Sequence, residues 1–380
     1  MAPVGTSVLI HAVGDVAPRR IEAGKPPESL FDAVAAKIRE ADIAVCQLER
    51  TLSTRGFVGD RDAHADGRAW QSRNHPDNVK SLVHAGFHLA TFGSNHCFDW
   101  GPDALLDTIG VLRANGIEVI GAGRDSEEAR KPAIFTFRGT TIAFLDYNCI
   151  LPDDYEAREG KPGCAGIRIS THYEPQEYQP GMPPRIITTP LEEDVVTVES
   201  DIRQARTKAD VVVISVHWGV HRIPGLLADY EFSLGHRAID AGADLIIGTH
   251  THLLKGVEVY KGKVIFHNLG NFGFDYEPPE SKPPEGAVKA LRREQQPRYG
   301  YSMKVEKQYS MMMRCLIENK RIDRVSFLPA LINEKSEPRF LKADERQFQD
   351  IVQYLTNWSS GLGSEFRTEG DEVVVVPTKK

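Results

Sequence analysis

Short apolar runs alternate with amphipathic segments along most of the chain. Uninterrupted apolar runs predict buried strands at 8–13, 41–46, 89–92, 117–121, 211–216 and 244–247. Apolar residues at every third or fourth position predict helices at 29–40, 76–85, 103–114, 196–208 and 230–241. A repeated strand–helix order is typical of a largely parallel sheet covered by helices. We therefore expect an α/β sandwich.

Strand-like runs joined by short turns predict antiparallel additions to this core. Hairpins are expected at 133–138 with 141–146 and at 257–260 with 264–267. A smaller tail follows, with strands at 311–317 and 324–328 and a helix at 343–355. We expect residues 1–302 to form the main domain and residues 303–380 to pack on that same domain.

Three stretches interrupt the alternation, at 52–75, 152–190 and 276–301. The first contains Arg55, Arg61, Arg68 and Arg73, whose guanidinium groups suit carboxylate or phosphate. Long loops in a compact domain are either functional or solvated surface segments. All three follow the ends of strands that carry or adjoin the candidate site described next, so we expect them to wall or cover it.

The side chains that follow the strand-like runs share a metal-binding chemistry. They are Asp15, Glu49, Asn95, His96, His217, His250 and His252. The carboxyl ends of parallel strands meet at one edge of a sheet, which gathers these residues. In an extended backbone, His250 and His252 would point to the same side. Their mixture of oxygen and imidazole ligands suits Zn, Mn, Fe or Co, whereas Ca or Mg would want more oxygen. The pattern predicts a metalloenzyme.

Composition and charge limit the classes of partner that the chain is expected to bind. The chain has 380 residues and a net charge of −7, which argues against nucleic acid. It has no apolar stretch near the roughly 18 residues that span a bilayer. No leader pattern precedes the first strand-like run. We expect no membrane partner and a cytoplasmic protein, or one trimmed of a leader. Five scattered cysteines without a CxxC pair indicate buried thiols, although Cys97 beside His96 is an alternative nucleophile.

Several local sequence words resemble one known family. They are Gly14-Asp15-Val16, Leu48-Glu49, 94–101 (SNHCFDWG), 216–219 (VHWG), 242–252 (GADLIIGTHTH) and 268–272 (NLGNF). This chain resembles the CapA family of capsule or poly-γ-glutamate synthesis proteins from about Val8 to Phe274. That family is itself similar to the calcineurin-like metallophosphatases. The resemblance implies a four-layer αββα sandwich with the site at the strand ends.

The resemblance also assigns roles. It implies metal ligation by Asp15, Asn95, His217, His250 and His252, with Glu49 in the place of a bridging carboxylate. It implies that His96 contacts the substrate and acts as an acid, oriented by Asp99. Two positions depart from the pattern, because Ala17 stands where the superfamily has a histidine and Gln47 where the family has asparagine. We expect a divalent metal (Mn, Zn, Fe or Ca), with one ion firmly held and a second site weak.

These residues leave several functions open. The first is a metal-dependent hydrolase of an amide, γ-glutamyl or peptide bond, in which metal-activated water attacks and His96 moves a proton. His217 or His221 is the candidate for a second acid/base group. The alternatives are a phosphoesterase, a metal-assisted peptide epimerase and a non-catalytic capsule-polymer binding protein. We expect a small-molecule or peptide substrate of anionic character, and the sequence leaves the oligomeric state open.

Overall fold

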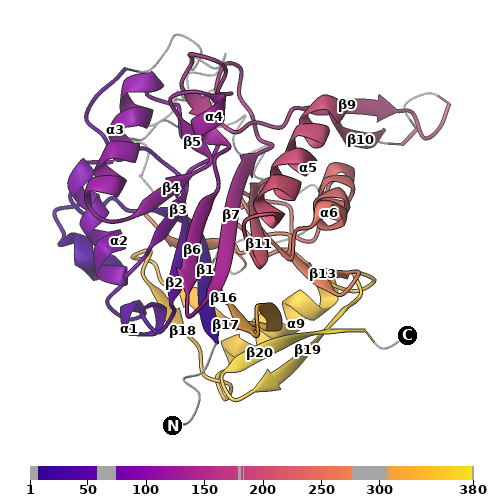
Figure 1. Cartoon of the computed structure of the whole chain (residues 1–380). Helices are drawn as coiled ribbons and strands as arrows, with labels where there is room; N and C mark the ends of the chain where they lie inside the picture. Colours follow the sequence, from indigo (N-terminus) through magenta and orange to yellow (C-terminus); the bar gives the residue numbers. More distant parts are fainter. Residues whose placement is uncertain are drawn as a thin grey trace.

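The computed structural model of the chain describes residues 7–57, 74–178, 181–182, 184–275, 306 and 308–378. Two large sheets form its centre, and helices lie on their outer sides (Figure 1). Within the described ranges, no helix is long and apolar enough to cross a membrane.

The first sheet runs in the order β19-β20-β17-β16-β1-β2-β3-β4, with β15 beside β1 and β18 beside β17. Strands β1 to β4 are parallel, and β16 is antiparallel to β1. The bounds are β1 (Val8–Ala17), β2 (Ile43–Leu48), β3 (Leu89–Thr91), β4 (Glu118–Ile120), β15 (Asn271–Phe274), β16 (Tyr309–Glu318), β17 (Arg321–Ile332), β18 (Pro338–Phe340), β19 (Ser364–Glu369) and β20 (Glu372–Pro377).

The second sheet runs in the order β13-β14-β12-β11-β7-β6, with parallel strands at its centre and antiparallel strands at both edges. The bounds are β6 (Ala133–Phe137), β7 (Thr140–Asn148), β11 (Val211–His217), β12 (Leu245–Thr249), β13 (Val257–Tyr260) and β14 (Lys263–Phe266). Both predicted hairpins are present in this sheet. A small sheet pairs β5 (Ala122–Gly123) with β8 (Gly163–Cys164).

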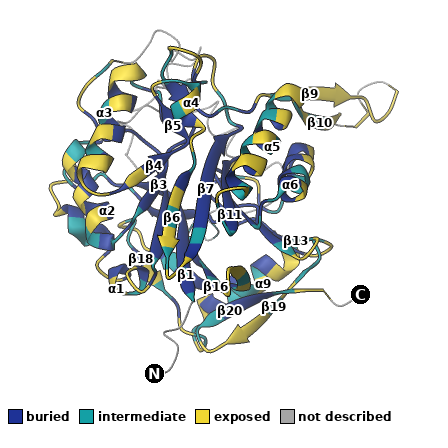
Figure 2. Ribbon diagram, in the orientation of Figure 1, coloured by how far each residue is buried: buried dark blue, intermediate teal, exposed yellow. Residues whose placement is uncertain are grey.

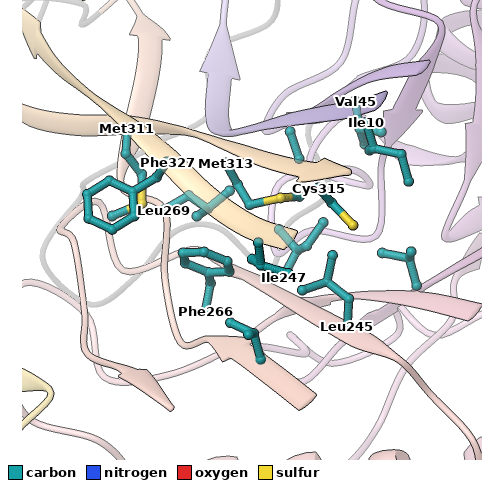
Figure 3. Packing of buried hydrophobic residues seen from close by; sticks show 14 of the residues in the cluster. Ile10, Val45, Leu245, Ile247, Phe266, Leu269, Met311, Met313, Cys315 and Phe327 are labelled. Carbon is teal, nitrogen blue, oxygen red and sulfur yellow. The ribbon is translucent and has the colours of Figure 1, made fainter. Parts of the chain in front are cut away.

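Alternating side chains place the two sheets face to face. Ile10 and Val45 of the first sheet share one buried cluster with Leu245 and Ile247 of the second (Figure 3). The intervening residues point outward and pack under helices in two further clusters. The helices are α1 (Ala35–Ile38), α2 (Val79–Ala85), α3 (Gly101–Ala114), α4 (Ser126–Ala129), α5 (Glu192–Arg206), α6 (Asp229–Ala241) and α9 (Arg346–Trp358). The fold is the four-layer αββα sandwich that the resemblance implied.

The single helix expected at 29–40 is wrong. A 3-10 helix at Pro27–Leu30 is followed by turns and then by the single turn of α1. The backbone leaves helical geometry at Phe31 and Val34, whose φ angles are −118° and −123°. Both side chains are fully buried against the first sheet. Core packing has therefore overridden the helical spacing of the sequence.

The three irregular stretches have different outcomes. Residues 58–73 and 276–305, which include Arg61, Arg68 and Arg73, lie outside the described residues. The stretch 152–190 is not simply a loop, because it contains β9 (Ile169–Glu174) and β10 (Arg185–Pro190). This hairpin extends outward from the side of α5 (Figure 1), and its surface is exposed (Figure 2).

Candidate metal centre

The site begins at a close approach between two strands. A Cβ on Gly14 would lie 1.8 Å from the carbonyl oxygen of Gly270, so a side chain cannot fit there. This allows β15 to pair with the end of β1, where the Asp15 N–H donates to Gly270 O at 3.0 Å. Asp15 is thereby held at the carboxyl end of β1 with no exposed surface. Glycine before this aspartate is thus a packing requirement.

The extended backbone expected at His250 and His252 is wrong. Strand β12 ends at Thr249, and the two histidines have φ angles of 99° and 57°. Positive φ is uncommon and strained for residues other than glycine, and residues strained in this way are often held at functional sites. The His250 N–H donates to both carboxylate oxygens of Asp15, at 3.1 and 3.2 Å. This buried hydrogen bond offsets the strain, and the two rings come together with centroids 6.4 Å apart.

One group of ligands surrounds His217. Its Nε2 lies 2.8 Å from Asn95 Oδ1, 3.2 Å from His250 Nδ1 and 3.7 Å from Glu49 Oε2. Thr249 Oγ1 lies 3.0 Å from the other ring nitrogen, Nδ1. When Nδ1–H donates to Thr249, Nε2 presents its lone pair toward these neighbours. Oxygen and nitrogen lone pairs then converge on one small volume, which is the arrangement of a cation site.

A second group shares Glu49 with the first. His252 Nε2 lies 3.8 Å from Glu49 Oε1, and His252 Nδ1 lies 3.2 Å from Asp15 Oδ2. Asn271 Oδ1 also faces this Nδ1, at 2.7 Å, and keeps Nε2 directed at Glu49. This group lacks the imidazole that the resemblance places at position 17, where the chain has Ala17. Its set of candidate ligands is therefore smaller than that of the His217 group.

Glu49 is the strongest indication that these residues suit a cation. Its side chain is fully buried, and neither carboxylate oxygen has a hydrogen-bond partner in the described residues. Burial, followed by the charge of Asp15, raises the pKa of Glu49 well above its usual value. Burial, followed by neighbouring histidines, lowers the pKa of His217 and of His250, so both rings are neutral and able to bind metal.

The distances fit a divalent ion. Two ligands bound at about 2.1 Å to one ion can be at most about 4.2 Å apart. All the pairs given above around His217 and Glu49 are closer than that. A buried carboxylate without a partner is costly, and a bound cation removes that cost. The residues present therefore fit a divalent metal.

A hydrogen-bonded relay stands beside the ligands. His96 Nδ1 lies 2.7 Å from Asp99 Oδ2, and the Tyr155 hydroxyl donates to Asp99 Oδ1 at 2.8 Å. His96 Nε2 is 3.9 Å from Glu49 Oε1. The His96 side chain is 18% exposed, so a substrate can reach it, whereas Asp99 is buried. This arrangement suits proton transfer at His96 Nε2, with Asp99 holding the ring.

The other candidate acid/base and nucleophilic residues differ in how far they are exposed to solvent. His217 is fully buried, which favours a ligand over an acid/base group. His221 is exposed, and its ring centroid lies 5.0 Å from those of both His250 and His252. Cys97 is fully buried, and burial followed by the neighbouring Cys164 raises the pKa of its thiol well above normal. This argues against Cys97 as a nucleophile, and all five cysteines are buried and free.

A buried lysine fastens the loop that carries His221. The Lys255 ammonium donates to the carbonyl oxygens of Ile223 and Leu226, the latter at 3.0 Å. Lys255 is 1% exposed, although the loop that it holds is largely at the surface. On the same loop, Gly225 lies against the Trp358 ring of α9, where a Cβ would be 1.9 Å from a ring atom. The C-terminal tail and Lys255 therefore position this side of the site.

We expect Lys255→Met to loosen this loop. The carbonyl groups of Ile223 and Leu226 would lose their hydrogen bonds to a charged donor, each of which contributes about 1.5–3 kcal/mol. Hydrogen exchange in residues 220–228 should become faster, while metal content stays unchanged because Lys255 is not a ligand. Lys261→Met, at an exposed lysine, is the matched control. Unchanged exchange in this segment would show that Lys255 does not hold it.

Sequence reasoning gave no role to three residues that orient the site. Thr249 and Asn271 face ring nitrogens of His217 and His252, and Tyr155 holds Asp99. Thr249 and Asn271 stand inside the family-like words at 242–252 and 268–272, which was an available signal. Tyr155 had no such signal, because it comes from the irregular stretch after β7 and meets Asp99 only in the folded chain.

Comparison with known proteins places the chain among capsule proteins. A probable polyglutamine synthesis accessory protein of Mycobacterium tuberculosis is 29% identical over 245 residues, covering 62% of this chain and 56% of that protein. The PGA biosynthesis protein CapA of Bacillus subtilis is 28% identical over 270 residues, covering 69% and 62%. The chain thus spans about three fifths of the length of these relatives.

A solved structure and a family profile complete the comparison. A hypothetical protein from Thermus thermophilus matches with a TM-score of 0.43 and 15% identity, covering 84% of this chain and 98% of that one. The profile of the bacterial capsule synthesis protein PGA_cap matches residues 9–276, which contain every candidate ligand described above. The chain therefore belongs to the bacterial capsule synthesis protein PGA_cap family.

Proposed function

We propose that the protein is a metal-dependent hydrolase that cleaves an amide bond, of γ-glutamyl or ordinary peptide type, in a small anionic substrate. The observation that carries the proposal is the buried, unsatisfied Glu49 carboxylate among Asp15, His217 and His252. The choice of an amide bond is supported by the relatives, whose names refer to the synthesis of PGA and of polyglutamine.

The metal-ligand groups and the hydrogen-bonded set His96, Asp99 and Tyr155 have different roles in the proposed reaction. A divalent ion held by Glu49, Asn95, His217 and His250 would polarise the substrate carbonyl and lower the pKa of a bound water. His96 donates a proton from Nε2 to the departing amine nitrogen. The negative charge of Asp99, held by Tyr155, stabilises the imidazolium before this transfer. An amide requires such a donor, because without a proton the nitrogen would have to leave as an amide anion, which is a poor leaving group.

We expect metal-loaded protein to hydrolyse members of a panel of γ-glutamyl amides and acidic peptides. His96→Gln should lower kcat by about 10²–10⁴-fold, the usual contribution of a positioned acid, without changing the metal content. Asp99→Asn should also lower kcat, because the ring loses its charged acceptor. Product formation is measured by mass spectrometry, alongside elemental analysis of each variant.

The controls separate this proposal from the alternatives. His84→Gln changes a histidine on α2 that is paired with Asp32, away from the ligands, and should leave kcat unchanged. Turnover of phosphomonoesters or phosphodiesters without amide cleavage would replace the proposal with a phosphoesterase. Deuterium entering a peptide from solvent without cleavage would indicate an epimerase. Polymer binding without any turnover, unaffected by His96→Gln, would indicate a non-catalytic protein.

A further inference from the structure

The β9–β10 hairpin forms a sheet of its own. Its two strands pair only with each other among the described residues, and they join neither large sheet. The base is tied to α6, because Thr188 N donates to Asp229 Oδ2 and Tyr230 N donates to Thr188 Oγ1, both at 3.3 Å. The rest extends away from the body of the molecule (Figure 1). A two-stranded ribbon is marginally stable by itself, and among the described residues no third strand lies beside this arm.

One face of the arm carries most of its apolar side chains, and Ile187 lies on the other. Tyr173 pairs with Ile186, and Ile169 pairs with Pro190, and these positions share a face because directly opposed residues do. Ile169 packs against the helix-covered cluster of the second sheet. Toward the tip, Tyr173 is 67% exposed and Ile186 57% exposed. The apolar face therefore begins in the core and continues into solvent.

Exposed apolar surface is concentrated here. Among the described residues, large hydrophobic side chains with high exposure cluster between positions 173 and 196, namely Tyr173, Tyr178, Met182, Ile186, Leu191 and Val196. Exposed apolar side chains gathered in one segment of the chain are a candidate interaction surface. A standard interface buries about 800 Å² per partner. The two tyrosines alone can contribute roughly 300–500 Å², and their apolar neighbours extend the patch.

The pattern along β9 is self-complementary. We propose that two copies of the chain dimerise by antiparallel pairing of their β9 strands, about a two-fold axis at Thr171. In this register Ile169 lies opposite Tyr173 of the partner subunit, and Ser170 lies opposite the partner subunit's His172. Glu174, the only carboxylate within β9, comes opposite Arg168 of the partner subunit. Because Arg168 already binds Asp194 and Glu193 within its own chain, the match that favours self-pairing in this isologous register is the apolar one, Ile169 with Tyr173.

The proposed pairing also gives the two-stranded β9–β10 sheet additional strands. Two hairpins joined at β9 would form a four-stranded sheet in the order β10-β9-β9-β10. Residues 169, 171 and 173 of both copies would then form one continuous apolar face. An exposed strand edge readily accepts another strand, and sheets of three or more strands with an apolar face are stable. A second copy is favoured over an unrelated partner because only identical edges supply this matched register.

The first test is the mass of the full chain in solution, measured by sedimentation across a hundredfold range of concentration. The wild type should sediment as a dimer, and Tyr173→Lys/Ile186→Lys should weaken the dimer about tenfold or more. Val83→Lys changes another exposed apolar residue, on α2, and should have no effect. A wild type that stays monomeric at every concentration would overturn the proposal, as would a dimer insensitive to the arm substitutions.

Cross-linking tests the register itself. Thr171→Cys places a thiol at the two-fold axis, where it faces its own copy and should form an intersubunit disulfide under mild oxidation. Ser170→Cys, one residue away, faces a different position of the partner and should cross-link much less. The five native cysteines are buried, so their background is low. Equal cross-linking of the two variants, or none in a protein that is dimeric, would contradict pairing about Thr171.

Discussion

Replacing Glu49 with Gln should abolish tight binding of a divalent ion. Glu49 contributes to both ligand groups, and its oxygens lie 3.7 Å from His217 Nε2 and 3.8 Å from His252 Nε2. The amide has the same shape but lacks the charge that balances a cation. The loss should exceed the about 10–100-fold that removing an outer hydrogen bond costs. Elemental analysis of purified protein, after incubation with Mn, Zn or Ca, measures the result.

A thermal shift gives the same comparison without activity. An ion at 100 times its dissociation constant stabilises the fold by about 2.7 kcal/mol. The wild type should show this stabilisation, and Glu49→Gln should not. Glu40→Gln, at an exposed carboxylate, is the control. Metal-dependent stabilisation of Glu49→Gln equal to that of the wild type would show that the ion binds elsewhere.

The two ligand groups can be ranked in the same experiment. His250→Gln affects the group around His217, and His252→Gln affects the group that lacks an imidazole at position 17. We expect His250→Gln to cause the larger loss of the firmly held ion. An equal or greater loss in His252→Gln would reverse the assignment of the firm position.

Replacing His267 with Gln should destabilise the protein by about 3–5 kcal/mol, the cost of breaking a buried ion pair. His267 is fully buried between Glu258, at 3.1 Å, and Glu231, at 3.4 Å. Without the imidazolium, the buried carboxylates of Glu231 and Glu258 lose the cation that lies between them. The damage should also reach the site, because the His267 ring stacks on Trp218 with ring centroids 5.8 Å apart, and Trp218 directly follows His217. Urea unfolding measures the free-energy change.

The pH dependence of the free energy of unfolding tests whether the charge of His267 is the source of this stability. Burial alone would lower the pKa of His267, but the nearby carboxylates of Glu231 and Glu258 outweigh burial and raise the pKa above its usual 6.5. The folded protein therefore keeps a proton that the unfolded chain releases above pH 6.5. This contribution to the free energy of unfolding is complete below pH 6.5 and is lost as the pH rises through the folded pKa. His267→Gln should remove that decline.

His236 provides the matched control. It also contacts Glu258, at 2.6 Å, but its side chain is 32% exposed. Its removal should cost less than about 1 kcal/mol, because solvent screens a partly exposed pair. If His236→Gln destabilised the protein as much as His267→Gln, burial between the two carboxylates would not be the source of the effect.

Sequence patterns were most informative where a residue's role depends on its local position. The ends of β1, β2, β3, β11 and β12 were predicted to within a few residues, because buried parallel strands are uninterrupted apolar runs. Predicting where strands end also predicted which polar side chains would meet, since parallel strands share one carboxyl edge. The family-like words agree with this arrangement, and the profile match covers them.

Sequence alone thus determined the four-layer fold, the edge at which the site lies and the chemistry of its ligands. The tertiary structure decided what distant segments do to one another. The turn at His250 and His252 follows from the contact with Asp15, and the orientation of Asp99 follows from Tyr155. The surroundings of Glu49 leave its carboxylate without a hydrogen-bond donor among the described residues. The break in the helix at 29–40 came from the burial of Phe31. The physical reason is that strand periodicity is set by neighbours along the chain, whereas backbone strain and the satisfaction of a buried charge depend on which remote groups arrive at the same place.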